Sequence, residues 1–464
     1  MNLHLVDTAL ILAYVISLYI IGRVLKKQSQ GDSNYMLAAR QLSLPAFVMT
    51  LVTTWYGAIL GLGEFIFGYG VVAWVTNGFL WYFVYIFFAL FLSKRIHDAK
   101  YMTIADQLEH RIGKKTARIA GFFTFIMTSP APYIFSLALV IQLVFGWPLW
   151  VALTVGSVFS GMYIWSSGFR AVVKTDMVQF VFMYLGFFLL LFFSVQHFGG
   201  LEFLQANVPA THFSWKGELP ITTIIVWGFL ALWTLVDPNF YQRCAAAKDA
   251  KTAQKGIFWA TLCWFIFDML TLFTGLYARA AFPDTNAIFS YFTLAQGVLP
   301  WGIFGLFIIS ILSIIMSTID SFLFSGSAIL AKDFLQKKFT ALSLTVLTKI
   351  GIVLTIFLSL LFIYLFQSII GIIYAIGSMG VSALLFPTLL SLFSKKQWSD
   401  TFVMWSMIMA GISSGSWLVY GWLHQSFGFP TYLFGIEPMY IGLVASGVVL
   451  FVPKIFQKKQ MQLE

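Results

Sequence analysis

The segment from Pro300 to Asp333 reads PWGIFGLFIISILSIIMSTIDSFLFSGSAILAKD and decides the class of fold. It is one long apolar stretch with a polar stripe made of Ser310, Ser313, Ser317, Asp320, Ser321 and Ser325. Steps of three and four residues place these side chains on one face of a helix. A carboxylate in mid-membrane costs roughly 2.5 to 3.5 kcal/mol, so we expect Asp320 to face a partner, a cavity or an ion. Oxygen ligands suit hard cations, which makes the stripe a candidate cation site.

The composition is that of a polytopic, all-α membrane protein. Of the 464 residues, 59% are hydrophobic and 10% are charged, whereas ordinary globular chains carry about 25% charged residues. A helix needs about 20 apolar residues to cross the hydrocarbon core. We predict thirteen spans, with cores near residues 5–25, 43–70, 72–93, 118–145, 147–166, 175–196, 220–236, 256–280, 299–331, 341–365, 367–393, 401–424 and 435–455. The first lacks a basic leader and a small-residue cleavage site, which predicts a retained helix.

The net charge of +10 is distributed as a topology signal. All of the 28 basic residues except Lys216 and Arg279 fall in alternate connections between the predicted spans. Basic residues collect on the cytoplasmic side, so we predict an N-terminus outside and a C-terminus inside. The same distribution forms no single basic surface, which argues against nucleic acid as a partner.

The sequence offers little for redox or hydrolytic chemistry. Its two cysteines, Cys244 and Cys263, have neither a disulfide framework nor metal-ligand spacing. The motifs H-x-x-x-H and H-E-x-x-H are absent from the sequence, and no nucleophile–base pair is recognisable. We therefore expect no enzyme and no cofactor of that kind.

Two of the predicted spans carry residues that disfavour a regular helix. The second contains TTWYG at residues 53–57, followed by Gly61 and Gly63, and we expect a break near 53–57. The seventh contains Trp227-Gly228 and Trp233-Thr234, with Asp237-Pro238 at its predicted inner end. Interrupted helices five spans apart indicate a transporter built from inverted repeats, with its binding site at mid-membrane.

Three further carboxylates lie in or beside predicted spans, and each has two interpretations. Glu64 either contacts a substrate or ion, or is a neutral, hydrogen-bonded structural group. Asp268 has the same alternatives, with the structural interpretation favoured. Asp176 either pairs with Lys174 or Arg170, or shares a cation with the Asp320 helix.

Three motifs together resemble the sodium:solute symporter family over essentially the whole chain. They are RAVVKTDMVQ at 170–179, QRCAAAK at 242–248, and MSTIDS at 316–321 with Asp333 closing that helix. The resemblance implies a leucine-transporter-like fold: two inverted five-helix repeats with one extra helix before and two after. The implied divisions are residues 1–42 (extra helix and inner loop), 43–197 (first repeat), 198–394 (second repeat) and 395–464 (two additional helices).

The resemblance also implies two sodium sites. The family's main site carries over to backbone carbonyls of Leu51, Thr54 and Ile314 and hydroxyls of Ser317 and Thr318. A second site, known in some members, carries over to Asp176, Ser317, Asp320 and Ser321, although Asp320 replaces a hydroxyl or small residue there. Two carboxylates either hold a cation well or repel each other so that one stays protonated.

The predicted solute pocket consists of Trp55, Tyr56, Glu64, Asn77, Tyr133 and Trp233, although each aromatic residue could equally serve packing. The expected function is a sodium-coupled symporter that imports a small organic solute across a bacterial inner membrane by alternating access. Its expected partners are the solute, sodium ions as coupling ion, and the lipid bilayer; the sequence does not indicate the oligomeric state. A proton-coupled transporter using Asp320, Asp176 or Glu64 is the nearer alternative. A transporter-like sensor is the alternative of a different class, although the chain ends at Glu464 just after its last predicted span.

Overall fold

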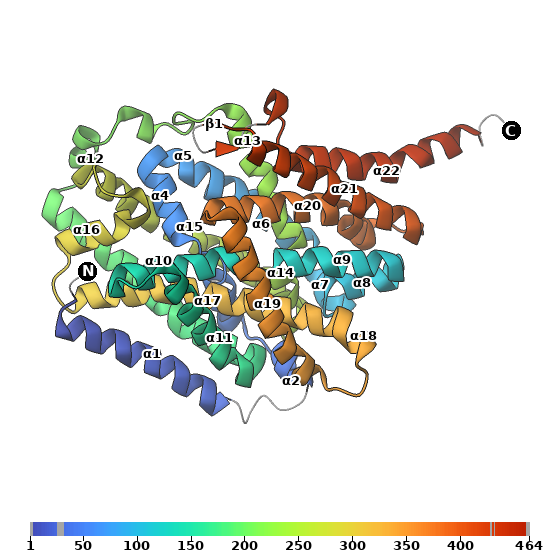
Figure 1. Ribbon diagram of the computed structural model, residues 1–464, viewed down its shortest axis with the longest axis horizontal. Coiled ribbons are helices and arrows are strands. Elements are labelled where there is room, and N and C mark those ends of the chain that lie inside the picture. The colour runs from blue at the N-terminus through green and yellow to red at the C-terminus, as the bar shows by residue number, and fades with distance from the viewer. Residues whose placement is uncertain (1–2, 26–31, 427–428, 431, 461–464) are drawn as a thin grey trace.

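The computed structural model describes residues 3–25, 32–426, 429–430 and 432–460, and it is almost entirely helical (Figure 1). The α-helices, in chain order, are α1 Leu5–Leu25, α2 Asp32–Leu37, α3 Leu44–Thr53, α4 Ile59–Tyr69, α5 Val71–Trp74, α6 Leu80–Phe91, α7 Ser93–Ala99, α8 Ile104–Arg111, α9 Lys114–Met127, α10 Ala131–Phe145, α11 Leu149–Phe198, α12 Leu201–Asn207, α13 Ile221–Leu230, α14 Pro238–Ala246, α15 Ala250–Ala281, α16 Ser290–Val298, α17 Ile303–Ile329, α18 Gln336–Lys338, α19 Leu344–Phe366, α20 Ile369–Phe393, α21 Asp400–Leu423 and α22 Pro438–Gln460.

The remaining regular structure is short. Two π-helical turns, Val75–Phe79 and Leu330–Leu335, interrupt or extend the α-helices. Turns of 3-10 helix span Ala38–Arg40, Ala210–Phe213, Ala231–Val236, Ala287–Phe289 and Leu433–Gly435. A two-residue hairpin, β1 Gln425–Ser426 with β2 Phe429–Pro430, joins α21 to α22. These pieces leave the predicted all-α class unchanged.

Nine helical segments in the described part of the chain are long and apolar enough to cross a membrane. They are Val71–Phe91, Lys114–Phe145, Gly168–Phe198, Ile221–Ala246, Ala250–Ala281, Ile303–Lys338, Leu344–Phe366, Ile369–Phe393 and Asp400–Leu423. Shorter apolar helices cover the other predicted spans, among them Leu5–Ile21 and Pro438–Phe451. The polytopic membrane class is therefore confirmed, while the count of thirteen stays a prediction.

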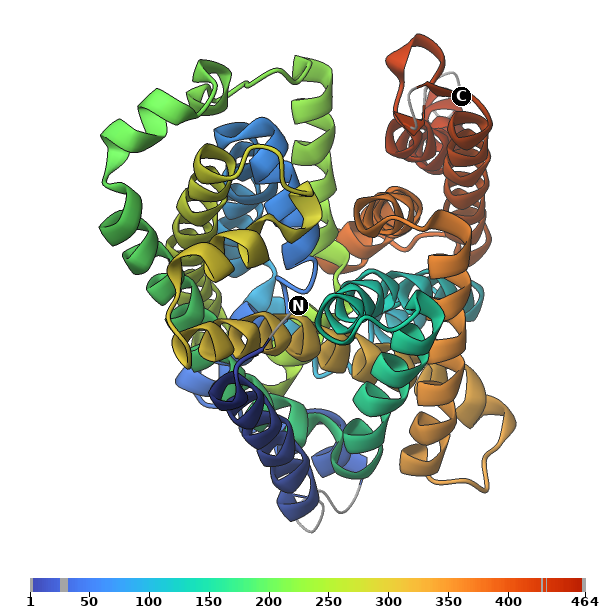
Figure 2. The same ribbon diagram turned by 60° about the vertical axis from the view of Figure 1, so that its left-hand side comes forward.

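Helix α17 is the central element of the bundle, and nearly all its side chains from Phe304 to Ile329 are buried. Its polar stripe is satisfied by neighbouring helices: Ser310 donates to the Met183 carbonyl at 3.1 Å, and Ser313 donates to the Tyr14 hydroxyl at 2.9 Å. In Figures 1 and 2, α1 and α22 lie on opposite sides of the molecule, and α1 contacts α17 through Tyr14. The polar face thus points into protein.

The predicted break in the second span is confirmed. Helix α3 ends at Thr53 and α4 begins at Ile59, so that five residues run between them without helical structure. The segment contains Thr54 and Gly57, whereas Thr53 ends α3 and Gly61 and Gly63 lie in α4.

The seventh span is also interrupted, but it extends further than predicted. The interruption is the 3-10 turn Ala231–Val236 followed by Asp237, whereas Trp227 and Gly228 lie in regular helix α13. Asp237 does not end the span but starts α14, because its carboxylate accepts the Asn239 amide at 2.6 Å and caps the new helix. The span therefore continues through Ala246.

The connection between the fifth and sixth predicted spans is a kink and not a loop. Helix α11 changes direction at Gly168, which has φ +63°. A Cβ at this position would lie 2.6 Å from the Tyr35 carbonyl oxygen, so glycine is required both for its backbone angle and for space. As a result Arg170 and Lys174 belong to the helix that leads into Asp176.

Candidate functional site

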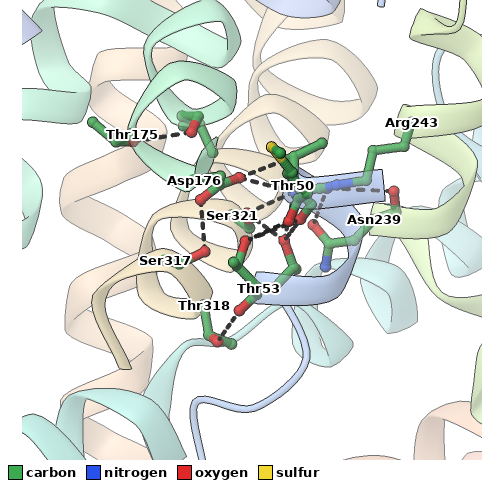
Figure 3. Close-up of polar contacts among 12 residues, drawn as sticks. Thr50, Thr53, Thr175, Asp176, Asn239, Arg243, Ser317, Thr318 and Ser321 are labelled. Atoms are coloured by element: carbon green, nitrogen blue, oxygen red, sulfur yellow. Dashed lines mark hydrogen bonds and ion pairs between the residues drawn. The ribbon is translucent and has the colours of Figure 1, made fainter. Parts of the chain in front are cut away.

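The end of α3 meets the middle of α17 through backbone carbonyls and hydroxyls. The Thr318 hydroxyl lies 3.2 Å from the Thr53 carbonyl oxygen of α3 and 3.0 Å from the Ile314 carbonyl oxygen of its own helix (Figure 3). Leu51, Thr54, Ile314, Ser317 and Thr318 are all buried at this junction. The carbonyl that Thr318 reaches belongs to Thr53, one residue before the expected ligand Thr54.

Gly57 lets the break approach α17. A Cβ on Gly57 would lie 2.5 Å from the Thr318 Cβ and 2.6 Å from a ring carbon of Tyr133. Either the break or α17 would have to shift to admit it. The unwound segment, the Thr318 hydroxyl and the Tyr133 ring are therefore packed as one unit.

We expect Gly57→Ala to destabilise the protein by about 1–3 kcal/mol, the usual effect of overpacking. Gly68→Ala is the matched control, because no atom lies within 4 Å of the Cβ position on this exposed face of α4. Chemical unfolding in mixed micelles measures both variants. Equal stabilities of the two variants would contradict the close approach at Gly57.

Asp176 forms the centre of a buried polar network. Its carboxylate accepts hydrogen bonds from Ser317 of α17, at 2.6 Å, and from Thr50 of α3 (Figure 3). The ion pair that it makes is with Arg243 of α14, at 3.8 Å, and both side chains are fully buried. Three helices and the second half of α11 therefore meet at one carboxylate.

Arg243 donates to three hydroxyls, one of which, that of Ser321, belongs to the predicted second cation site. Its Nη2 lies 3.1 Å from the Thr50 hydroxyl, 2.6 Å from that of Thr54 and 2.7 Å from that of Ser321. The Thr54 and Ser321 hydroxyls are 2.9 Å apart. A guanidinium thus holds α14 against both α3 and α17.

Thr50 and Arg243 were not predicted as site residues. Thr50 lies one helical turn before Thr54, so the same face of α3 carries both hydroxyls. Arg243 is part of the QRCAAAK motif, but its partner comes from a distant helix that the sequence does not reveal. Of the second predicted cation set, Asp176, Ser317 and Ser321 are brought together here, and Asp320 is fully buried on the same helix.

A cavity lies beside the two helix breaks. Its volume is about 110 Å³, well above the roughly 10–15 Å³ that one water molecule requires. Five of the six predicted pocket residues line it: Trp55, Tyr56, Asn77, Tyr133 and Trp233. The cavity follows α4 and α13, whereas the network around Arg243 joins α14 to α3 and α17.

The sixth predicted pocket residue is misplaced. Glu64 is exposed on α4 and is not among the residues that line the cavity. Its place as the acidic group is taken by Asp268 of α15, which is buried and accepts hydrogen bonds from Tyr56, at 2.5 Å, and from Tyr82. The structural interpretation of Asp268 holds only in part, because the carboxylate also lines the cavity.

The family model of the sodium:solute symporter family matches residues 35–410. This chain belongs to the sodium:solute symporter family. Because the family is one of transporters, the prediction of a transporter-class membrane protein that is not an enzyme is confirmed.

Curated relatives of this family member are distant. Human sodium/glucose cotransporter 4 is 26% identical over 422 residues, which cover 79% of this chain and 62% of that protein. The sodium/pantothenate symporter of Haemophilus influenzae is 31% identical over 181 residues, 37% of each chain. The chain thus spans less than two thirds of the length of the human relative.

Solved structures share the fold of this family member at low identity. A substrate-bound, outward-open Na⁺-coupled sialic acid symporter has a TM-score of 0.81 at 16% identity and covers 97% of this chain and 98% of that one. The nucleobase-cation-symport-1 transporter Mhp1 has a TM-score of 0.54 at 13% identity, over 93% and 96% of the two chains. The leucine-transporter-like fold is confirmed by these likenesses.

Proposed function

We propose that this chain is a sodium-coupled symporter that imports a small organic solute by alternating access. The observation that carries the proposal is the junction of α3 and α17, where the Thr318 hydroxyl approaches the free carbonyl end of an interrupted helix. Oxygen atoms from an unwound backbone and from hydroxyls are the ligands that hard cations prefer.

The proposed main sodium site uses carbonyls of Leu51, Thr54 and Ile314 with the Ser317 and Thr318 hydroxyls. Sodium here would fix the break of α3 and α4 against α17. The same break carries Trp55 and Tyr56, which line the cavity, so sodium would order two walls of the solute site. By linkage the solute would tighten sodium binding by the same factor.

The proposed second site, of Asp176, Ser317, Asp320 and Ser321, competes with an internal cation. Arg243 already donates to Ser321 and lies 3.8 Å from Asp176. A sodium ion would have to displace this guanidinium or share Asp176 with it. One coupled sodium is therefore the stoichiometry that this arrangement favours.

One sodium is sufficient for concentrative uptake. At about 100 mV and a tenfold gradient, each ion supplies roughly 3.7 kcal/mol, which corresponds to about 500-fold accumulation of a neutral solute.

The proposed location is the inner membrane of a bacterium, with the N-terminus outside and the C-terminus in the cytoplasm. The positive-inside distribution supports this orientation. It places α3 and α14 in the cytoplasmic half and the cavity in the outer half. The division into residues 1–42, 43–197, 198–394 and 395–464 is part of the same proposal, supported by the interruptions five spans apart.

Thermal unfolding of the purified protein in detergent tests the function. The screen uses amino acids, sugars, sugar acids, carboxylates, vitamins and organic amines, each in sodium and in potassium at equal ionic strength. We expect at least one compound to raise the Tm only in sodium. Stabilisation that is equal in both salts but shifts with pH would favour proton coupling instead.

Ser317→Ala and Thr318→Ala are expected to weaken sodium binding at least tenfold, since a hydrogen bond or contact to a charged group contributes about 1.5–3 kcal/mol. Ser327→Ala is the matched control: it also removes a buried α17 hydroxyl, but one that bonds the Leu323 carbonyl of its own helix. Sodium titration of the Tm gives the affinities. An unchanged sodium affinity in both site variants would refute the proposed main site.

A further inference from the structure

The walls of the cavity are dominated by aromatic rings in close mutual contact. The Tyr85 and Trp264 ring centroids are 4.3 Å apart, and those of Trp55 and Trp81 are 5.3 Å apart. All four residues line the cavity. Aromatic faces attract organic cations electrostatically, and they also contact apolar carbon atoms well.

The cavity has an unbalanced negative charge. Asp268 is the one charged residue among the described residues that line it, and no lysine, arginine or histidine accompanies it there. One carboxylate oxygen accepts from Tyr56 and the other from Tyr82. Two tyrosine hydroxyls, one at each oxygen, suit the ionised form of a carboxylate, which only accepts. A bound anion would face this charge without a counter-charge from the cavity wall.

The neighbouring helix is shaped to leave room for the carboxylate. A Cβ on Gly78 would lie 2.5 Å from the Asp268 Oδ2. Gly78 belongs to the π-helical turn Val75–Phe79, whose Asn77 also lines the cavity. Single π-helical turns inside α-helices occur frequently at functional sites.

The indole nitrogen of Trp233 is a buried donor beside the cavity. Trp233 is buried in the interrupted seventh span and lines the cavity, and within the described chain its indole Nε1 has no hydrogen-bond partner. An indole N–H donates only, so it requires an acceptor. This nitrogen is itself buried, so Trp233 contributes its ring to the cavity wall. An occupant with a positive charge would satisfy Asp268.

We propose that the solute is a small organic ammonium ion with a compact apolar body. The inference rests on the proposed symporter function, in that the cavity is taken as the solute site. Asp268 supplies the counter-charge, and the rings of Trp55, Trp81, Tyr85 and Trp264 surround the cation.

Binding to the full-length protein tests the solute class, with tryptophan fluorescence as the readout because several indoles line the cavity. The probes are two matched pairs: choline with its neutral isostere 3,3-dimethyl-1-butanol, and 2-phenylethylamine with 2-phenylethanol. The anion 3-phenylpropanoate is the opposite-charge probe. We expect at least one cation to bind tenfold or more tightly than its neutral partner and than the anion.

Three variants test whether the preference for a cation depends on Asp268. Asp268→Asn is expected to remove the tenfold preference, and Gly78→Ala to reduce it by displacing the carboxylate. Asp284→Asn, which removes an exposed loop carboxylate, keeps the full preference. The wild-type comparison between paired probes decides the question even where a variant does not fold.

Three outcomes would overturn the proposal. The neutral or anionic probes bind as tightly as the cations or more tightly, neither cation binds at 10 mM, or the preference for the cation survives Asp268→Asn. Failure of sodium coupling gives a different result: the cations then bind equally in sodium and in potassium. Sodium-dependent binding of neutral solutes alone would keep the symporter function and refute the solute class.

Discussion

Replacing Arg243 with methionine should lower the free energy of unfolding by about 3–5 kcal/mol, because it leaves a buried carboxylate without its counter-charge. Both Arg243 and Asp176 have fully buried side chains, and the guanidinium also satisfies Thr54 and Ser321. Chemical unfolding in mixed micelles measures the loss. Arg95→Met is the matched control; Arg95 is exposed and bonds the Leu392 carbonyl at 2.8 Å, so we expect less than about 1 kcal/mol.

The double variant Arg243→Met/Asp176→Asn should recover much of this loss, because no uncompensated charge remains. Sodium should also stabilise Arg243→Met more steeply than the wild type. Without the guanidinium, a sodium ion can bind at Asp176 and Ser317. Because the ion binds only the folded state, it stabilises that state by mass action. If the losses of unfolding free energy in the two single variants add up in the double variant, Arg243 and Asp176 do not act as a pair. A sodium dependence that equals that of the wild type would remove Asp176 from the proposed cation sites.

The positions of the helix breaks followed from local sequence, whereas the partners of the charged groups did not. Threonines and glycine at 53–57 disfavour a helix wherever they lie, so the first break was predictable from the residues alone. The second break was predicted from Trp227-Gly228 and Trp233-Thr234, and only the second pair lies in it. The continuation of the span as α14 depends on the Asp237 cap and on packing against distant helices.

The choice between Glu64 and Asp268 illustrates what local sequence omits. Both carboxylates lie in apolar helices, and periodicity does not reveal which face of a helix meets a cavity. Asp268 points inward because Tyr56 and Tyr82 approach it from 212 and 186 residues away in the chain. Glu64 has no such neighbours and is exposed. Long-range contacts of this kind determine the candidate site, as they do for Arg243 and Asp176.

A disulfide between Asn239→Cys of α14 and Ser325→Cys of α17 should abolish transport and leave solute binding intact. The Asn239 amide oxygen and the Ser325 hydroxyl are 2.7 Å apart, and both residues are buried. In the proposed alternating-access cycle a path opens on the cytoplasmic side, and α14 then has to move away from α17. The experiment uses a background in which Cys244 and Cys263 are replaced by alanine, so that the introduced pair holds the reactive thiols.

Uptake into proteoliposomes of the compound selected by the sodium screen is the measurement. Oxidation should reduce uptake to background, and dithiothreitol should restore it, while sodium-dependent binding to the cavity is the same in both states. Each single-cysteine variant is the control for the effect of the substitution itself. Full transport by the oxidised double variant would mean that α14 and α17 move together. The cytoplasmic path would then have to open by movement of α3 away from α17, at the contact between Thr53 and Thr318.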